Sequence, residues 1–404
     1  MSMTTAEEAL KTILAQIEPK GLEKIAIDAA LGRILAEDVI ARRSNPPMDN
    51  SAMDGYAVIA QDIQSATPDN PVTLAVVEDI AAGAIATKTL RPHQAMRIMT
   101  GAPIPAGADA VLMQEDTEKN GGSILAKDKA EVGENIRLAG EDVKEGETAI
   151  PKGVTIAPAH IGMMAVCGRS SVFVGQQPTV AILSTGDEVV DLDGDPTGPC
   201  IYNSNGYMLA AQIRSAGGVP HYMGIARDDE QDLLEKFSWA LQCDVLVSSG
   251  GVSVGDYDLV KATLDKLGNE MVFWKVAMKP GKPLAFGKIQ GKPVFGLAGN
   301  PVSSFVSFEQ FVRPAIKKMM GAADLKPKTV QAKLTRTIRK KAGRLHFQSA
   351  TVAWDQGEYT VTPALEQGSG VLKSTVTANG LLVFPLEAEE LKSGESVTVQ
   401  LLES

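Results

Sequence analysis

The sequence contains few cysteines, no long apolar run and no excess of positive charge. Its three cysteines lie far apart without a CxxC pair, a usage typical of reduced thiols in the cytoplasm. No stretch approaches the roughly 18 uninterrupted apolar residues of a membrane span, and the N-terminus lacks a basic-then-apolar signal pattern. A net charge of -10 argues against non-specific nucleic-acid binding. We therefore expect a cytoplasmic protein that binds neither nucleic acid nor membrane.

Several familiar catalytic and nucleotide-binding motifs are also missing. The segment GGVSVG (250–255) is not the GxGxxG of dinucleotide-binding folds, and no GxxxxGK[ST] P-loop or GxSxG elbow occurs. The four histidines are isolated and make no HExxH, so we interpret them as core or surface residues rather than zinc ligands. Any phosphate recognition would therefore use strand-end loops, helix N-termini and lysines.

The length of 404 residues predicts two to four domains. Residues 45–140 contain short β-branched runs cut by Gly, Pro and Asn, which indicates a β-rich module inserted into a domain formed by residues 1–44 and 141–177. Near the start of that domain, Thr5 and Glu8 form a capping box for a helix that stops at Pro19. Residues 328–404 alternate polar and apolar side chains, which predicts a C-terminal all-β domain.

Between these parts, residues 178–327 alternate near-continuous apolar strands with amphipathic helices. The helical periods cover residues 204–216, 230–241, 259–267 and 302–320. Such alternation predicts a doubly wound, mostly parallel sheet with helices on both faces. The fold class that we expect is therefore multidomain α/β plus β.

Four strand ends of the α/β region carry loops rich in acids or glycine: STGDE (184–188), RDD (227–229), SSGGVSVGDYD (248–258) and LAGNP (297–301). Open α/β sheets bind ligands at the carboxyl ends of their strands. Carboxylates that converge there with room for water are the usual arrangement for Mg²⁺. The stretch KVAMKPGKP (275–283) adds three lysines that could neutralise phosphates.

Each of these features also has a plainer explanation. An acid after a strand is often only the N-cap of the next helix, and we expect that role for either Asp228 or Asp229. Glycines at strand ends are common in turns, and lysines beside Pro and Gly are usually solvated. The functional interpretation gains weight because several such loops should meet at one edge of one sheet.

Seven motifs occur in a fixed order along the chain: DNSAMDGYAV (49–58), RIMTGAPIP (97–105), NIRLAGEDV (135–143), STGDE, SSGGVSVGDYD, KPGKP (279–283) and GNPVS (299–303). With them the chain closely resembles the molybdopterin molybdenumtransferase family of the MoeA type, also represented by the E domain of gephyrin. The similarity spans essentially the whole sequence.

The resemblance implies the last general step of molybdenum cofactor synthesis. In that step adenylylated molybdopterin and molybdate yield AMP and molybdenum bound to the dithiolene sulfurs, assisted by a divalent cation, usually Mg²⁺. The resemblance also implies an elongated homodimer, joined through a linker and dimerisation domain (1–44 and 141–177). The α/β domain of one subunit would face the inserted module of the other. Other proteins of cofactor synthesis are candidate partners.

The resemblance also assigns candidate roles to individual residues. Those expected to act in catalysis are Glu188, Asp258, Asp228 and Asp54, with Glu188 and Asp258 as metal ligands. Those expected to bind substrate are Thr100, Arg137, Asp142, Ser249, Gly250, Gly251, Lys275, Lys279 and Pro301. The two lysines match family lysines placed for anion binding. Asp54, Thr100, Arg137 and Asp142 would complete the cleft from the partner subunit, although the residues alone also allow ordinary turn and surface roles.

Two regions depart from the family pattern. Ala298 stands where the family usually has a proline before the GNP loop, which leaves that loop less rigid. In the C-terminal domain Ser349 and His346 replace a common basic and a common acidic residue, although Arg344 remains.

Two other classes of function stay open at this point. The STGDE and SSGG loops also occur in related pterin-adenylating proteins and in nucleotide-pyrophosphate hydrolases of similar fold, but the adenylating relatives are usually single small domains. A gephyrin-type scaffold would need an exposed apolar groove beside the C-terminal domain. The choice between molybdate and tungstate and the identity of the cation are not encoded in these motifs.

Overall fold

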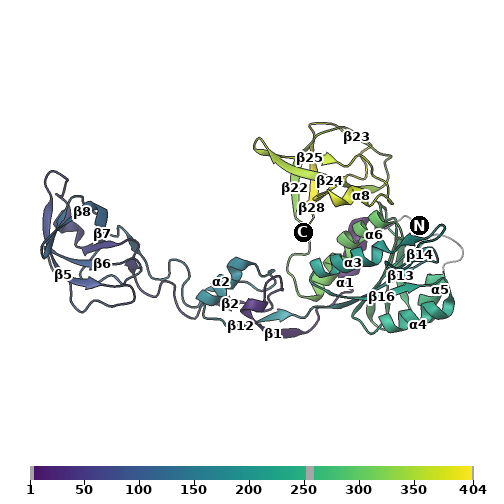
Figure 1. Cartoon of the computed structure of the whole chain (residues 1–404), viewed down its shortest axis with the longest axis horizontal. Helices are drawn as coiled ribbons and strands as arrows, with labels where there is room; N and C mark the ends of the chain where they lie inside the picture. The colour runs from purple at the N-terminus through teal and green to yellow at the C-terminus, as the bar shows by residue number, and fades with distance from the viewer. Residues whose placement is uncertain (1–3, 252–258, 403–404) are drawn as a thin grey trace.

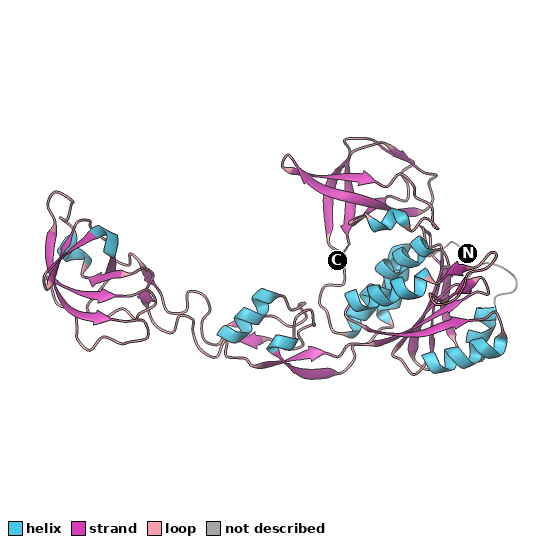
Figure 2. Cartoon of the chain, in the orientation of Figure 1, coloured by secondary structure: helices cyan, strands magenta, loops and turns pink. Residues whose placement is uncertain are grey.

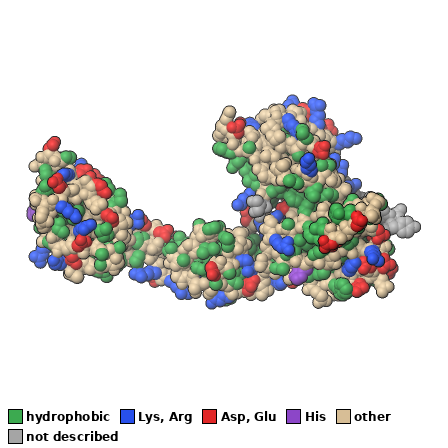
Figure 3. Space-filling view, in the orientation of Figure 1, with side chains coloured by type: hydrophobic (Ala, Val, Ile, Leu, Met, Phe, Trp, Pro, Cys, Tyr) green, Lys and Arg blue, Asp and Glu red, His purple; other side chains and the backbone are tan. Residues whose placement is uncertain are grey.

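The computed structural model describes residues 4–251 and 259–402. The chain is elongated, with the inserted module at one end and the α/β and C-terminal domains at the other (Figure 1). The space-filling view shows a narrow waist where the linker from the module reaches the N-terminal domain (Figure 3). Multidomain α/β plus β architecture is confirmed, and helices are concentrated in the α/β domain (Figure 2).

The α/β domain contains a six-stranded sheet in the order β16-β13-β17-β21-β20-β18. The first four strands run parallel, and β20 and β18 are antiparallel additions at one edge. The strands of this sheet are β13 (Thr179–Thr185), β16 (Val219–Ala226), β17 (Val245–Ser249), β18 (Glu270–Lys275), β20 (Pro283–Ile289) and β21 (Lys292–Leu297). Its central strands are buried along their length, as expected for strands covered on both faces.

Helices cover both faces of this sheet. One face packs against α1 (Ala6–Ala15), α3 (Ser204–Ser215), α6 (Pro301–Ser307) and α7 (Arg313–Met319), which continues α6 through a π-helical turn, η4 (Phe308–Val312). The other face packs against α4 (Glu230–Ala240) and α5 (Leu259–Lys266). Two short pairs complete the domain: β14 (Val189–Val190) with β15 (Ile201–Tyr202), and β19 (Met278–Lys279) with the C-terminal domain.

The first helix, α1, begins with the capping box predicted from the sequence. Glu8 N–H donates to Thr5 Oγ1 at 3.2 Å, and Thr5 N–H donates to Glu8 Oε2 at 2.9 Å. The buried face of α1, Ala9 and Ile13, belongs to the core of the α/β domain. Its packing therefore differs from the expectation that residues 1–44 form one unit with residues 141–177. A helix with an apolar stripe packs on the nearest large apolar surface, whichever segment of chain follows it.

The rest of the N-terminal domain forms a small core of its own. Its elements are β1 (Leu22–Ala26), η1 (Ile27–Ala29), β2 (Val39–Ile40), β11 (Thr148–Ile150), α2 (Pro158–Val166) and β12 (Ser171–Gly175). β1 pairs with β12 and β2 pairs with β11, both antiparallel, so segments before and after the inserted module lie side by side. The pair β3 (Asn50–Ser51) and β10 (Ile136–Arg137) leads into the module.

The inserted module is a six-stranded mixed sheet in the order β7-β4-β6-β5-β9-β8 with two apolar clusters. Its elements are β4 (Gly55–Val58), η2 (Ala60–Ile63), β5 (Val72–Ile80), β6 (Gln94–Ile98), β7 (Ala110–Met113), η3 (Gln114–Asp116), β8 (Thr117–Asn120) and β9 (Ser123–Ala126).

The C-terminal domain is a small barrel that closes because β24 pairs with both β25 and β26. Its elements are β22 (Thr329–Leu334), β23 (Ile338–Arg339), β24 (Leu345–Asp355), β25 (Glu358–Pro363), α8 (Lys373–Val376), β26 (Gly380–Phe384), β27 (Glu390–Leu391) and β28 (Ser396–Leu401). Within the described ranges, no helix is both long and apolar enough to cross a membrane.

Candidate active site

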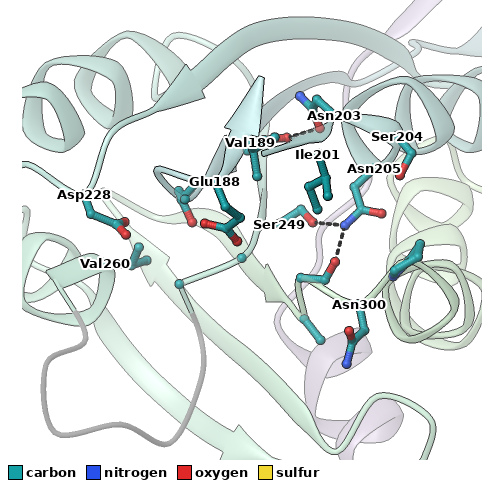
Figure 4. Close-up of a pocket in the computed structure, with 18 of the residues that line it drawn as sticks. Glu188, Val189, Ile201, Asn203, Ser204, Asn205, Asp228, Ser249, Val260 and Asn300 are labelled. Carbon is teal, nitrogen blue, oxygen red and sulfur yellow. Dashed lines mark hydrogen bonds between the residues drawn. The ribbon is translucent and has the colours of Figure 1, made fainter. Parts of the chain in front are cut away.

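A pocket of about 770 Å³ opens at the carboxyl ends of the parallel strands. It lies where β13, β17 and β21 end and the helices α3 and α6 begin, so the loops with acids and glycines meet at one edge of the sheet as predicted (Figure 4). The predicted site residues that line it are Glu188, Asp228, Ser249, Gly250, Gly251 and Pro301. The candidate site of the α/β domain is therefore a real cavity.

Three carboxylates cluster at the mouth of this pocket. Asp228 N–H donates to Asp187 Oδ1 at 3.1 Å, and Glu188 and Asp228 both line the cavity (Figure 4). Partial desolvation, together with the negative charges of Asp187 and Glu188, raises the pKa of Asp228. A cation would relieve this repulsion between like charges, and oxygen-rich sites of this kind suit Mg²⁺.

Asp228 and Asp229 have separate roles. Asp229 is the N-cap of α4 and accepts hydrogen bonds from the backbone N–H groups of Gln231 and Asp232, each at 3.0 Å. The sequence predicted a cap for one member of this pair, and the structure assigns it to Asp229. Asp228 is left at the pocket.

The end of β17 brings bare backbone close to the end of β13. Gly250 (φ 96°) and Gly251 (φ 65°) both have left-handed backbone conformations. A Cβ on Gly250 would lie 2.5 Å from the Thr185 carbonyl oxygen, and one on Gly251 would lie 2.2 Å from Val260 Cγ2. Only glycine fits at these two positions, and the pocket floor there consists of main chain.

The first turn of α3 joins several parts of the pocket. Asn203 caps the helix by accepting from Gly206 N–H at 3.0 Å, and it also accepts from Ser184 Oγ at 2.9 Å. Its amide donates to the Tyr222 hydroxyl at 2.7 Å. This network, drawn in part in Figure 4, fixes the helix N-terminus beside the end of β13.

Asn205 lies in the same first turn of α3, two residues after Asn203, and also lines the pocket. Its Nδ2 donates to Ser249 Oγ at 2.8 Å and to the Gly299 carbonyl at 2.7 Å (Figure 4). The Gly299 oxygen can only accept, so the orientation of the amide group is fixed. Asn205 thereby ties α3 to the ends of β17 and β21.

The buried hydroxyl of Thr185 has no hydrogen-bond partner within the described residues, although it lines the pocket. A buried polar atom without a partner is costly, and at a binding site it is commonly satisfied by the ligand. Thr185 Oγ1 is thus available to a polar group bound over the glycine loop.

The C-terminal domain also reaches this pocket. Asn300 Nδ2 donates to Ser369 Oγ at 3.2 Å, Val302 N–H donates to the Ser369 carbonyl at 3.0 Å, and Gly370 lines the cavity. This contribution comes from the loop at residues 368–371, while the departures at His346 and Ser349 lie on β24. Ala298 lines the pocket where the family usually has proline.

The two candidate lysines do not line this pocket. Lys275 ends β18, and Lys279 lies on β19, paired with His346 of β24. Burial, followed by the positive charges of Lys279, Lys340 and Arg344, lowers the pKa of His346 to about 4. Three cationic side chains therefore lie close to His346 where β19 of the α/β domain pairs with β24 of the C-terminal domain.

Asp54 and Thr100 belong to the inserted module, which lies at the other end of the elongated chain from the pocket (Figure 1). Arg137 lies on β10, in the strand pair that leads into the module, and Asp142 lies next to Val143 of the N-terminal domain core. Asp54 accepts from both the backbone N–H and the Oγ1 of Thr100, each at 2.7 Å, and these two bonds lower its pKa. Asp142 accepts instead from Asn45 Nδ2 at 2.9 Å, and Arg137 pairs with Asn50 through the backbone of β10. Asp54 and Thr100 are therefore brought together, without contact to the pocket of the same chain.

Asp258, predicted from the resemblance as a metal ligand, lies outside the described residues. In the parts of the chain that the structure does describe, no group of three or more His, Cys, Asp or Glu side chains is arranged to hold a metal ion. Glu188 and Asp228 are the two acids among the described residues that line the pocket.

Sequence reasoning did not single out Asn203, Asn205 or Gly370. Asn203 had a usable signal, because an asparagine directly before a helical period is a favoured N-cap. Asn205 had none, since its role depends on β17 and β21 being neighbours. The contribution of Gly370 depends on how the C-terminal barrel docks, which no local pattern encodes.

Comparison with known proteins agrees with this geometry. Three family models match in order: the MoeA N-terminal region (domain I and II) over residues 4–168, the probable molybdopterin binding domain over residues 181–318, and the MoeA C-terminal region (domain IV) over residues 331–402. The chain belongs to the MoeA family.

Relatives named molybdopterin molybdenumtransferase match it nearly end to end. One from Bacillus subtilis is 37% identical over 402 residues, covering 98% of this chain and 93% of the relative. Molybdopterin molybdenumtransferase 2 of Mycobacterium tuberculosis is 39% identical over 384 residues, covering 93% of this chain and 94% of the relative. The crystal structure of a molybdopterin biosynthesis MoeA protein from Pyrococcus horikoshii superposes with a TM-score of 0.86 at 32% identity, covering 99% of this chain and 100% of the other.

Proposed function

We propose that this MoeA-family chain is a molybdopterin molybdenumtransferase that inserts molybdate into adenylylated molybdopterin and releases AMP. The observation that carries the proposal is the pocket itself, where carboxylates, a glycine-lined floor and a helix N-terminus meet at one sheet edge. Bare backbone and a helix N-terminus suit phosphate groups, and the acids suit the cation that accompanies them.

The pocket residues divide the work of binding an anionic pterin nucleotide. Gly250 and Gly251 allow the phosphates to approach the main chain, and Thr185 Oγ1 offers a buried hydrogen-bonding group beside them. Asn205 holds α3 against the glycine loop, so the cavity keeps its shape when the ligand arrives. Because both substrates are anions, positioning and charge neutralisation account for most of the expected rate gain.

Magnesium fits this site only in part. Glu188 and Asp258, together with substrate phosphate oxygens, would hold the ion, which would withdraw charge from the phosphoanhydride as it breaks. Asp228 has a separate proposed role in proton transfer, which does not require the ion. With its pKa raised, Asp228 is better able to accept and return a proton of the water that cleaves the anhydride.

Molybdate is expected to bind beyond the edge of this pocket. Lys279 pairs with His346 through the backbone, and the positive charges of Lys279, Lys340 and Arg344 all act on the His346 side chain and lower its pKa. The loop that carries Lys279 continues through Gly281, which packs against Ser307 of α6, to Pro283 at the pocket wall. An oxyanion held there would lie between the C-terminal barrel and the pterin pocket. Lys275 would assist from the end of β18.

A second part of the proposal concerns the inserted module. Asp54 and Thr100 form an acceptor and donor pair at the surface of the inserted module, and neither is among the described residues that line the pocket at the strand ends. We assign that pair, with Arg137 and Asp142, to the pocket of the partner in a cytoplasmic homodimer with composite sites. The elongated shape supports this arrangement, because it leaves the module free to reach another subunit (Figure 1).

The decisive experiment incubates the protein with adenylylated molybdopterin, Mg²⁺ and molybdate, and follows AMP and active cofactor. Glu188→Gln and Asp54→Asn should each abolish Mg²⁺-dependent AMP release without unfolding the protein. After dissociation and mixing of the two variants, about a quarter of wild-type activity should return, because half of the dimers are mixed and each contains one intact site. No recovery on mixing would show that each cleft is complete within one chain.

A further inference from the structure

A second cavity, of about 540 Å³, lies where the N-terminal domain, the α/β domain and the linker to the C-terminal barrel meet. Its walls come from residues 31–34 and Thr155, from the ends of α3 and α7, and from residues 324–328. Hydrogen bonds hold these walls together: Ala323 N–H donates to the Gly153 carbonyl at 2.9 Å, and Gln177 Nε2 donates to the Gly217 carbonyl at 2.7 Å. The cavity is therefore formed by fixed segments.

The lining of this second cavity is strongly basic. Five cationic side chains face a single carboxylate, that of Asp324: Arg33, Arg214, Lys317, Lys326 and Lys328. The whole chain has a net charge of -10, so this concentration of positive charge is opposite in sign to its surroundings. Apolar side chains, Leu31, Ile34 and Met320 among them, form the rest of the wall.

Some of this charge has an ordinary structural use. Arg33 pairs with Glu23 and donates to the Gly175 carbonyl at 2.8 Å, so it is a structural arginine at the cavity wall. Arg214 and Lys317 lie in the last turns of α3 and α7, where cations complement the helix dipoles. Each helix C-terminus carries only about half a negative charge, so Arg214 at the end of α3 and Lys317 at the end of α7 are enough to offset the two helix dipoles.

Lys326 and Lys328 are not explained in this way. They come from the linker, not from a helix end, and across residues 4–251 and 259–402 neither side chain forms an ion pair. Asp324 accepts from the backbone N–H of Lys326 at 3.0 Å. Two exposed lysines added to a cavity that is already basic repel each other unless an anion lies between them.

We propose that this cavity is a second ligand site, which binds a small phosphorylated anion between the linker and the end of α3. Lys326, Lys328 and Arg214 bind the phosphate, and the apolar wall takes an attached group such as a nucleoside. The volume falls in the range of small-molecule pockets, roughly 300–1,000 Å³. This site goes beyond the proposed function, which uses the pocket at the strand ends, the lysines near His346 and residues of the inserted module, but none of the residues that line the second cavity.

The position of the cavity connects it to the first pocket. α3 begins at the first pocket with Ser204 and Asn205 and ends at the second with Arg214 and Ser215. The helix is about 18 Å long at 1.5 Å per residue. An anion at the second site would also join the linker to the N-terminal domain, whose extension carries the inserted module.

The test is equilibrium binding of inorganic phosphate, pyrophosphate and AMP to the full chain by isothermal titration calorimetry. In the double variant Lys326→Gln/Lys328→Gln, the affinity for these anions should fall at least tenfold at one class of binding site. The variant Arg214→Gln should lower the affinity of the same class of site. The matched control is Lys119→Gln/Lys129→Gln, which removes the same charge from exposed lysines of the inserted module and should bind as the wild type does. Thermal melting of each variant checks that it is folded.

The variant Asn205→Ala distinguishes the two sites. It should weaken AMP binding at the first pocket and leave AMP binding at the second cavity unchanged. If AMP binds more tightly than pyrophosphate, the ligand is a nucleoside phosphate; if all three probes bind alike, only the phosphate group is recognised. Equal binding by Lys326→Gln/Lys328→Gln and by its control would overturn the proposal. The wild-type protein could also show only one class of AMP site, and Lys326→Gln/Lys328→Gln could abolish it. That result would support the second cavity as a ligand site and would contradict the proposed binding of the pterin nucleotide in the first pocket.

Discussion

Asn205 Nδ2 lies 2.8 Å from Ser249 Oγ and connects the first turn of α3 to the last residue of β17. The same nitrogen donates to the Gly299 carbonyl, so one side chain fixes the distances among three walls of the pocket. Both its position and its orientation are determined by acceptors that belong to the ends of neighbouring parallel strands. The pocket therefore depends on a buried side chain that has no acidic or basic group.

Asn205→Ala should widen the pocket and weaken substrate binding. The variant leaves Ser249 and the Gly299 carbonyl without their donor, at a cost of about 1–3 kcal/mol in the free energy of unfolding. The KM for the pterin substrate should rise more than kcat falls, as steady-state kinetics would show.

The matched control for that variant is Asn379→Ala in the C-terminal barrel. Asn379 accepts from Val352 N–H at 2.7 Å and donates to the Val352 carbonyl at 2.9 Å, and neither residue lines the pocket. It should lose comparable stability and keep its KM. A similar rise in KM in both variants would mean that Asn205 acts through stability alone.

Much of this arrangement was predictable from the sequence, and the reasons are local. The apolar strands, the capping box at Thr5 and the acids after strands are short-range patterns, so the α/β fold and the pocket edge followed from them. Asn205 and Gly370 were not predictable, because their partners are set by sheet order and by barrel docking. The packing of α1 on the α/β domain was not predictable either, because it depends on tertiary contacts of Ala9 and Ile13 with the core of that domain.

Substitution of Asp229 should lower mainly the stability of the fold, whereas substitution of its neighbour Asp228 should lower mainly the activity. Asp229→Ala removes the cap of α4 and should cost about 1 kcal/mol of stability, with little change in activity. Asp228→Asn should lower activity about tenfold or more, by analogy with other residues that support a metal site. Chemical denaturation and AMP release, measured on both variants, give the comparison. Equal loss of activity in the two would show that α4, not the carboxylate of Asp228, matters.

The pH dependence of the Asp228→Asn effect follows from its raised pKa. The pKa of the Asp228 carboxyl is higher in the folded chain than its ordinary value of 3.8, so the folded state holds the proton up to a higher pH than the unfolded state does. The contribution of Asp228 to the free energy of unfolding therefore falls as the pH rises from 3.8 through the raised pKa. Asp228→Asn should therefore be slightly more stable than wild type at neutral pH, and this advantage should vanish in acid. Thermal melting from pH 3 to 7 would reveal it.

Gly250→Ala and Gly251→Ala should both abolish binding at the first pocket. A left-handed backbone costs a residue with a Cβ roughly 1–2 kcal/mol, and here the Cβ also meets the Thr185 carbonyl or Val260. Gly268→Ala is the control, because Gly268 has φ 80° after the end of α5 but no atom within 4 Å of the added Cβ. It should lose stability from the backbone alone and keep its activity. Full activity in Gly250→Ala would rule out main-chain contact with the ligand.

Thr100→Ala should raise the pKa of Asp54, because the lost hydroxyl hydrogen bond is the largest cause that lowers it. A carboxyl with a lowered pKa stabilises the fold above its unfolded value, and that stabilisation is lost as pH falls through the lower folded value. The variant should therefore be less stable than wild type at neutral pH, with the difference shrinking below the ordinary value of 3.8. If Asp54 serves the partner's pocket as a carboxylate, the acidic limb of the activity profile should also shift to higher pH in Thr100→Ala. An unchanged limb, measured as AMP release against pH, would place Asp54 outside the reaction.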